Sequence, residues 1–152
     1  MAHFARLNED NIVVQVIVIK NERTQDGNGD EVESIGAAFC ETIHEGTWKQ
    51  TSYNANMRGC FAGVGMTYME NVATLGVAST DIFIGQQPHP SWTIDPTTVE
   101  WKSPLGEPPG LTTSQLANYQ FYEWDESAYQ ADTSDPKTVG WILRDDPFWI
   151  HK

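Results

Sequence analysis

Basic side chains are scarce in this sequence. Its 152 residues include 21 Asp and Glu but only 9 Lys and Arg, which gives a formal net charge of −12. Binding to DNA, RNA or anionic lipid depends on basic side chains that neutralise phosphate, so this balance disfavours all three. We therefore expect neither a nucleic-acid partner nor a membrane partner.

Long hydrophobic runs are also missing. The longest apolar stretch, residues 12–19, is interrupted by Gln15 and is far shorter than the roughly 18 residues of a membrane span. The N-terminal residues MAHFAR lack the basic start and apolar core of a signal peptide. With 39% hydrophobic residues and 6 tryptophans, the chain is rich enough in large apolar groups to fold. We expect a soluble protein made in the cytoplasm, with one domain and at most a small appendage.

Cysteine is nearly absent, with only Cys40 and Cys60. Two thiols define neither a disulfide framework nor a zinc cluster, because the spacing between two cysteines is not diagnostic. A bridge between them and two free thiols both remain open.

Metal-binding patterns are incomplete. The loop Asp26-Gly27-Asn28-Gly29-Asp30 resembles the first half of an EF-hand, but Glu31 replaces the glycine at position 6 and Ala37 the acid at position 12. The four histidines are scattered without metal-ligand spacing. We therefore predict an exposed turn at residues 26–30 and no metal site.

Catalytic motifs are missing as well. No GK[ST] sequence occurs, and neither Ser91 nor Cys40 lies in a nucleophile motif. Pairs of carboxylates, which glycoside hydrolysis requires, do not indicate that activity here, because a chain with 21 Asp and Glu residues contains such pairs by chance. We predict no catalytic residues, no cofactor and no enzymatic activity.

The first two thirds of the chain carry mainly β signals. Residues 3–7 and 12–19 predict a hairpin, and the β-branched second strand is expected at the centre of the core. One short helix is predicted from Ser34, a candidate N-cap, to Gly46, a candidate terminator. Its apolar face is expected to comprise Ile35, Ala38, Phe39 and Ile43. Residues 47–53 and 80–84 predict further strands.

Two aromatic hairpins are predicted in the last third. Residues 91–95 and 99–102 flank a proline turn, and residues 119–126 and 138–143 flank a polar loop. The Pro- and Gly-rich residues 105–110 between them predict a semi-rigid linker. The expected fold is mainly β, an antiparallel sheet or sandwich-like domain over residues 1–104 with one short helix, followed by the linker 105–110 and a C-terminal hairpin extension over residues 111–152.

Tryptophan is the one concentrated signal, because five of the six lie after residue 90. They can serve as cross-strand core residues, or as interface anchors or platforms for sugar. Isolated hairpins are marginally stable and gain from a partner surface, which favours an interface. The candidate interface residues are Trp92, Trp101, Trp124, Trp141 and Trp149.

Five ordered segments resemble a family of small proteins of marine tailed bacteriophages, notably cyanophages. They are MAHFARL (1–7), IGAAFC (35–40), TWKQTSYN (47–54), FAGVGMTY (61–68) and QPHPSW (87–92). The resemblance covers about residues 1–104 and is looser beyond. The chain departs from it at Met66 and His89, where relatives carry Tyr. The family is mostly uncharacterised, and the resemblance implies a virion structural protein.

The resemblance and the acidity together suggest where such a protein would act. A DNA-facing protein would repel the packaged genome, whereas an acidic exterior protein gains solubility. We expect a non-enzymatic capsid decoration or cement protein on the outside of the virion, bound to the major capsid protein and to copies of itself. The alternatives are a tail-fibre or tail-associated adhesion module and, more remotely, an enzyme acting on host polysaccharide.

Overall fold

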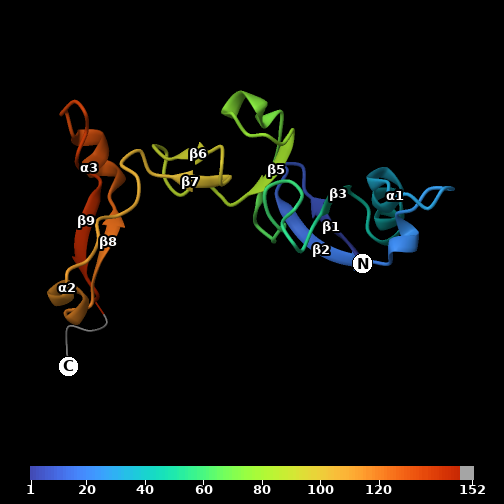
Figure 1. The fold of residues 1–152 in the computed structure, drawn as a ribbon, viewed down its shortest axis with the longest axis horizontal. Coiled ribbons are helices and arrows are strands. Elements are labelled where there is room, and N and C mark those ends of the chain that lie inside the picture. Colours follow the sequence, from blue (N-terminus) through green and yellow to red (C-terminus); the bar gives the residue numbers. More distant parts are fainter. Residues whose placement is uncertain (148–152) are drawn as a thin grey trace. The chain divides into compact units, whose positions relative to one another are not determined.

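The computed structural model describes residues 1–147, and over this range the protein is mainly β, as the sequence predicts. Small antiparallel sheets carry most of the regular structure (Figure 1). The strands are β1 (Ala2–Leu7), β2 (Val13–Ile19), β3 (Thr47–Thr51), β4 (Thr67–Glu70), β5 (Asp81–Ile84), β6 (Thr93–Asp95), β7 (Glu100–Lys102), β8 (Gln120–Trp124) and β9 (Trp141–Asp145). The helices are α1 (Glu33–Ile43), α2 (Thr113–Ala117) and α3 (Glu126–Ala131), with 3-10 turns η1 (Asn21–Arg23) and η2 (Val72–Leu75).

The predicted N-terminal hairpin is confirmed, but its second strand is not the centre of the core. The strand order is β2-β1-β3, so β1 is the middle strand and pairs on both sides. Phe4 and Ala5 on β1 are fully buried, whereas Val14 and Val18 on β2 are 39% and 48% exposed. An outer strand has a neighbour on one side only, which is why the more hydrophobic strand is the less buried one.

Both faces of β1 are covered, because successive side chains of a strand point to opposite faces. On one face, Phe4 packs in a cluster with Cys40 of α1 and Trp48 of β3. On the other, Ala5 and Leu7 pack with a cluster that includes Phe83 of β5. This two-sided cover makes β1 the central element of the core.

Helix α1 exists where one helix is predicted, but its cap and its buried face differ from the prediction. The N-cap is Val32, without a side-chain cap, and the helix ends with His44 as C-cap, before Gly46. Gly36 and Cys40 are buried, whereas Ile35, Ala38 and Ile43 are exposed, and Phe39 is half-buried. Phe4 lies so close to the helix that only a glycine, Gly36, fits beside it. The buried face of the helix is therefore the face with the small Gly36, not the face with the larger apolar side chains.

The predicted strand at residues 80–84 is confirmed as β5, which pairs with β4. The two cysteines are free thiols in the structure. Cys40 is fully buried, and burial raises its pKa to about 11, so it is a neutral apolar side chain near pH 7. Among residues 1–147, no helix is long and apolar enough to cross a membrane.

Contacts divide the chain into two compact units. The first comprises residues 1–86 and 94–101, and the second comprises residues 87–93 and the chain from Lys102. The predicted linker 105–110 lies within the second unit, and residues 87–93 join that unit from earlier in the sequence.

The second unit contains the predicted C-terminal hairpin, now β8 and β9, which run antiparallel side by side (Figure 1). The loop between the two strands is not only polar coil, because it contains α3. Helix α2 before β8 was not expected. Its sequence signal is a capping box, in which Thr112 and Gln115 each accept a hydrogen bond from the other's backbone N–H.

Candidate functional site

Three of the five predicted interface tryptophans come together in the second unit. Trp124 and Trp141 are cross-strand partners on β8 and β9, with ring centroids 5.3 Å apart and planes at 78°. Trp92 from the segment before β6 lies 6.0 Å from Trp124 and 5.9 Å from Trp141. We call Trp92, Trp124 and Trp141 the tryptophan cluster. Edge-to-face geometry of this kind stabilises aromatic packing beyond the area that it buries.

The other two predicted residues are not in the cluster. Trp101 belongs to the first unit, where it packs against an aliphatic cluster around Ile82 and donates its indole N–H to the carbonyl of Gly85 at 2.7 Å. Trp149 lies outside the described residues. The high tryptophan content of the last third of the sequence therefore grouped residues that lie in different environments in the structure.

A carboxylate supports the tryptophan cluster. Oε2 of Glu126, the first residue of α3, accepts the indole N–H of Trp124 at 2.9 Å and the hydroxyl of Ser91 at 2.7 Å. Its other oxygen accepts the amide of Gln130 at 2.7 Å. These hydrogen bonds, the one from Gln130 first, lower the pKa of Glu126 from its ordinary 4.5 to about 2. Glu126 thus ties the segment 87–93 to β8 and α3.

The lowered pKa gives a testable pH dependence. A carboxylate whose folded pKa is lowered adds stability above its unfolded pKa, and that contribution is lost as the pH falls from about 4.5 towards 2. We expect the Glu126 carboxyl resonance to titrate near pH 2, and its pKa to rise in Ser91→Ala, which removes one donor. Carboxyl NMR measures both. Ser114→Ala on α2 is the control, and an equal pKa in Ser91→Ala and wild type would contradict the assignment.

The second unit buries little apart from this cluster. Among the described residues, Trp124, 5% exposed, is its one buried apolar side chain, and all three hydrophobic core clusters lie in the first unit. Leu116, Phe121 and Val139 are 59%, 40% and 40% exposed. The indole N–H of Trp92 is buried and finds no acceptor within residues 1–147. The unit therefore exposes apolar side chains around a small aromatic core.

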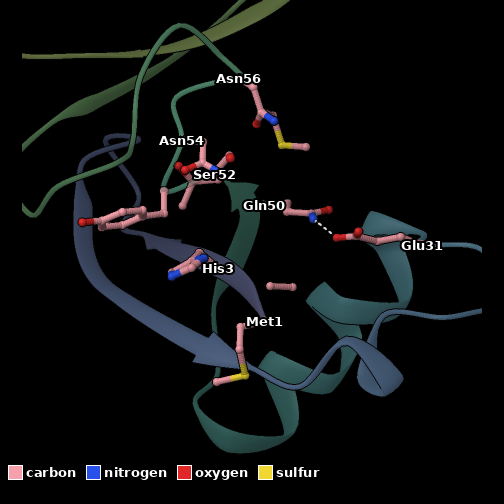
Figure 2. Close-up of a pocket in the computed structure, with 11 residues that line it drawn as sticks. Met1, His3, Glu31, Gln50, Ser52, Asn54 and Asn56 are labelled. Atoms are coloured by element: carbon pink, nitrogen blue, oxygen red, sulfur yellow. Dashed lines mark hydrogen bonds between the residues drawn. The ribbon is translucent and has the colours of Figure 1, made fainter.

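A second candidate site is a cleft of about 290 Å³ in the first unit. It opens where β3 ends and the loop 52–57 turns over the start of β1 (Figure 2). Gln50 extends towards Glu31 on one side, and His3 lies on the other (Figure 2). The cleft is lined by Met1, Ala2, His3, Glu31, Gln50, Thr51, Ser52, Tyr53, Asn54, Asn56 and Met57. Sequence reasoning missed it, because its residues come from three separate segments.

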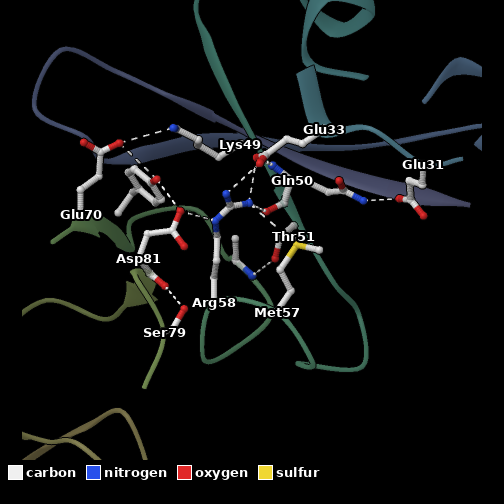
Figure 3. Close-up of polar contacts among 12 residues, drawn as sticks. Glu31, Glu33, Lys49, Gln50, Thr51, Met57, Arg58, Glu70, Ser79 and Asp81 are labelled. Carbon is white, nitrogen blue, oxygen red and sulfur yellow. Dashed lines mark hydrogen bonds and ion pairs between the residues drawn. The ribbon is translucent and has the colours of Figure 1, made fainter. Parts of the chain in front are cut away.

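Arg58 contacts Gln50, which lines this cleft, and two carboxylates beside it (Figure 3). Its guanidinium holds both carboxylate oxygens of Glu33 at 2.8 Å and Asp81 at 2.7 Å. It also donates to the carbonyl of Gln50 at 2.6 Å, and Glu33 accepts the backbone N–H of Gln50 at 2.7 Å. The backbone of Gln50 is thus held on both sides. The sequence offered one hint, since Arg58 is among only 9 basic residues and stands in an uncharged loop.

The Arg58 ion pairs shift the pKa values of their members. Burial opposes the charged forms, but the hydrogen bonds of Arg58 and Tyr68 outweigh it and lower the pKa of Asp81 below its usual range. For Glu33, burial is likewise outweighed by Arg58, and the pKa is lowered. Burial and the adjacent Asp81 carboxylate raise the pKa of Tyr68. All members thus keep their ordinary charge at neutral pH, which is the pattern of a structural ion-pair network.

The loop 26–30, which resembles part of an EF-hand, forms a turn in which the Asp26 side chain binds backbone N–H groups of the same loop. Oδ1 of Asp26 accepts the N–H groups of Asn28 at 2.8 Å and Asp30 at 3.0 Å. These bonds lower the pKa of Asp26. No group of three or more His, Cys, Asp or Glu able to hold a metal is found within residues 1–147.

Comparison with known proteins finds nothing similar: no family model, no curated protein and no solved structure matches the chain.

Proposed function

We propose that this protein is a structural component of a bacteriophage virion, a non-enzymatic decoration or cement protein on the outer face of the capsid. The second unit attaches it to the major capsid protein. The observation that carries the proposal is the burial pattern of that unit. Among its residues up to 147, a single apolar side chain, Trp124, is buried, and others such as Leu116 and Phe121 are exposed. A two-stranded hairpin is marginal alone and is stabilised by packing against another surface.

Two further features support an exterior structural role. The net charge of −12 suits a surface away from packaged DNA. The resemblance to small phage proteins, carried by segments such as TWKQTSYN (47–54), implies a virion component. Trp124 is 5% exposed, so its ring offers no free face to a sugar, which disfavours Trp124 as a platform in the tail-adhesion alternative.

Replacing exposed apolar side chains of the second unit tests the attachment. We expect Phe121→Ser combined with Leu116→Ser to remain folded, because both side chains face solvent, and to lose at least about tenfold in affinity for capsid shells that lack the protein. Co-sedimentation with the shells measures binding. Val64→Ser, which removes an exposed apolar side chain of the first unit, should bind normally.

Location and copy number decide between the capsid and the tail. A capsid decoration protein appears as density on the shell in a virion map, in copy numbers of the order of hundreds, whereas a tail component is present in about a dozen copies. Density on the tail alone would overturn the proposal, and so would wild-type binding of the double variant.

A further inference from the structure

We propose that the cleft of the first unit, between His3, Gln50 and the loop 52–57, is a binding site for a neutral saccharide ring. The site is separate from the attachment surface proposed above, which belongs to the second unit. Four observations carry the inference: unpaired polar side chains, an exposed aromatic ring, the charge of the lining and the rigidity of the floor.

Polar side chains converge on the cleft without hydrogen-bond partners among residues 1–147. Ser52, Asn54 and Asn56 come from the loop after β3 and lie around the opening (Figure 2). Their side chains make no hydrogen bond to any other residue within 1–147, and neither does the imidazole of His3. Each amide supplies a carbonyl acceptor and two N–H donors, and each hydroxyl does both. Such a mixed set matches the hydroxyls of a sugar, which also donate and accept.

Tyr53 adds a flat apolar surface. Its side chain is 73% exposed although it lines the cleft. The ring is held in place by Phe61, with centroids 5.6 Å apart, and by His3, with centroids 6.2 Å apart and planes at 27°. An exposed ring fixed by its neighbours can pack against the C–H face of a sugar, and its hydroxyl remains free to hydrogen-bond.

The charge of the lining selects a neutral ligand. Glu31 is its one acidic residue, and no Lys or Arg side chain lines the cleft. Arg58, beneath the floor, is paired with Glu33 and Asp81. Phosphate, sulfate and carboxylate ligands therefore meet the Glu31 carboxylate and no Lys or Arg side chain. A cationic ligand would leave the amide donors of Asn54 and Asn56 unused, whereas a neutral polyol uses donors and acceptors alike.

The floor of the cleft is rigid and the cleft has the size of one small ligand. Arg58 and Glu33 hold the backbone of Gln50, and Gln50 Nε2 donates to Glu31. The hydroxyl of Thr51 accepts the N–H of Ala62 at 2.9 Å, which fixes the end of β3. A fixed floor reduces the ordering cost of binding. The cleft volume, about 290 Å³, is at the lower end of small-ligand sites, which suits a single ring.

The test is an NMR titration of the full 15N-labelled chain with the methyl glycosides of glucose, galactose and mannose and with N-acetylglucosamine, with N-acetylneuraminic acid as the charged comparison. We expect at least one neutral sugar to shift the amides of His3 and residues 50–57, with a Kd of roughly millimolar order. Tyr53→Ala and Asn56→Ala should each weaken this binding about fivefold or more.

Matched variants keep the test specific. Val64→Ala removes another exposed apolar side chain of the first unit, and Asn118→Ala makes the same amide change in the second unit; both should bind as wild type. The amide spectrum of each variant reports whether it is folded. The proposal is overturned if no neutral sugar shifts the cleft amides, if the two cleft variants bind as wild type, if only N-acetylneuraminic acid binds, or if the shifts centre on the tryptophan cluster.

Discussion

Replacing Gly36 with alanine is expected to destabilise the first unit by about 2 kcal/mol, although alanine is the better helix former by about 1 kcal/mol. Gly36 lies within α1, where a Cβ atom would stand 2.3 Å from Cζ of Phe4 and 2.9 Å from Cγ2 of Thr24. Both of these side chains are fully buried, so neither can move aside without disturbing the core. Overpacking therefore outweighs the gain in helix propensity.

Urea unfolding followed by the amide signals of the first unit measures this effect. Ser34→Ala, at an exposed position of the same helix, should change stability by less than about 0.5 kcal/mol. Gly27→Ala is the matched glycine control, because nothing lies within 4 Å of its added Cβ. A Gly36→Ala variant as stable as the wild type would show that α1 does not pack as closely on Phe4 as described.

Replacing Arg58 with methionine is expected to cost about 3 kcal/mol at neutral pH. The side chain of Arg58 is 11% exposed and pairs with both Glu33 and Asp81, so its removal leaves two partly buried carboxylates without their hydrogen-bonded ion-pair partner. Methionine keeps much of the apolar volume of the arginine side chain, so the substitution removes mainly the charge and the hydrogen bonds. Arg58→Lys should recover only part of the loss, because an ammonium group cannot make the bidentate contact with Glu33.

The cost of Arg58→Met should shrink in acid. Glu33 and Asp81 have folded pKa values below their ordinary values of 4.5 and 3.8. The stability that the ion pairs add is therefore complete above the ordinary pKa values, and it is lost as the pH falls through the lower, folded ones. Urea unfolding at neutral pH and near pH 3 measures the difference. Arg144→Met is the control, since its pairs with Glu123 and Asp125 are exposed and should contribute less than about 1 kcal/mol. A penalty that is independent of pH would contradict the network.

Local sequence patterns predicted much of the secondary structure. A run of β-branched residues identified β2, aromatic pairs identified the hairpin of β8 and β9, and apolar spacing identified α1. These patterns depend on neighbouring residues and on the period of each element, so they can be recognised without the tertiary structure. The same reasoning misplaced the N-cap of α1, which is Val32. It also misplaced the buried face of the helix, because that face depends on Phe4, which is distant in sequence.

The candidate sites were predicted less well. Tryptophan content pointed to the second unit, where Trp92, Trp124 and Trp141 do meet, but it could not separate Trp101, whose partners lie in the first unit. The cleft was not predicted at all. Its lining joins the start of β1, the segment before α1 and the loop after β3. The pairing of β1 with β3 and the hydrogen bonds of Gln50 with Glu31 and Glu33 bring these segments together.

The sequence by itself determined that this is an acidic, mainly β protein with its tryptophans concentrated near the C-terminal end, because charge, strand period and composition are properties of the chain alone. The tertiary structure decided which strand is central, which side of α1 is buried and which polar residues share a cleft. These depend on contacts between distant residues, such as Arg58 with Glu33 and Phe4 with Gly36, and a close contact of this kind leaves no periodic signal in the sequence.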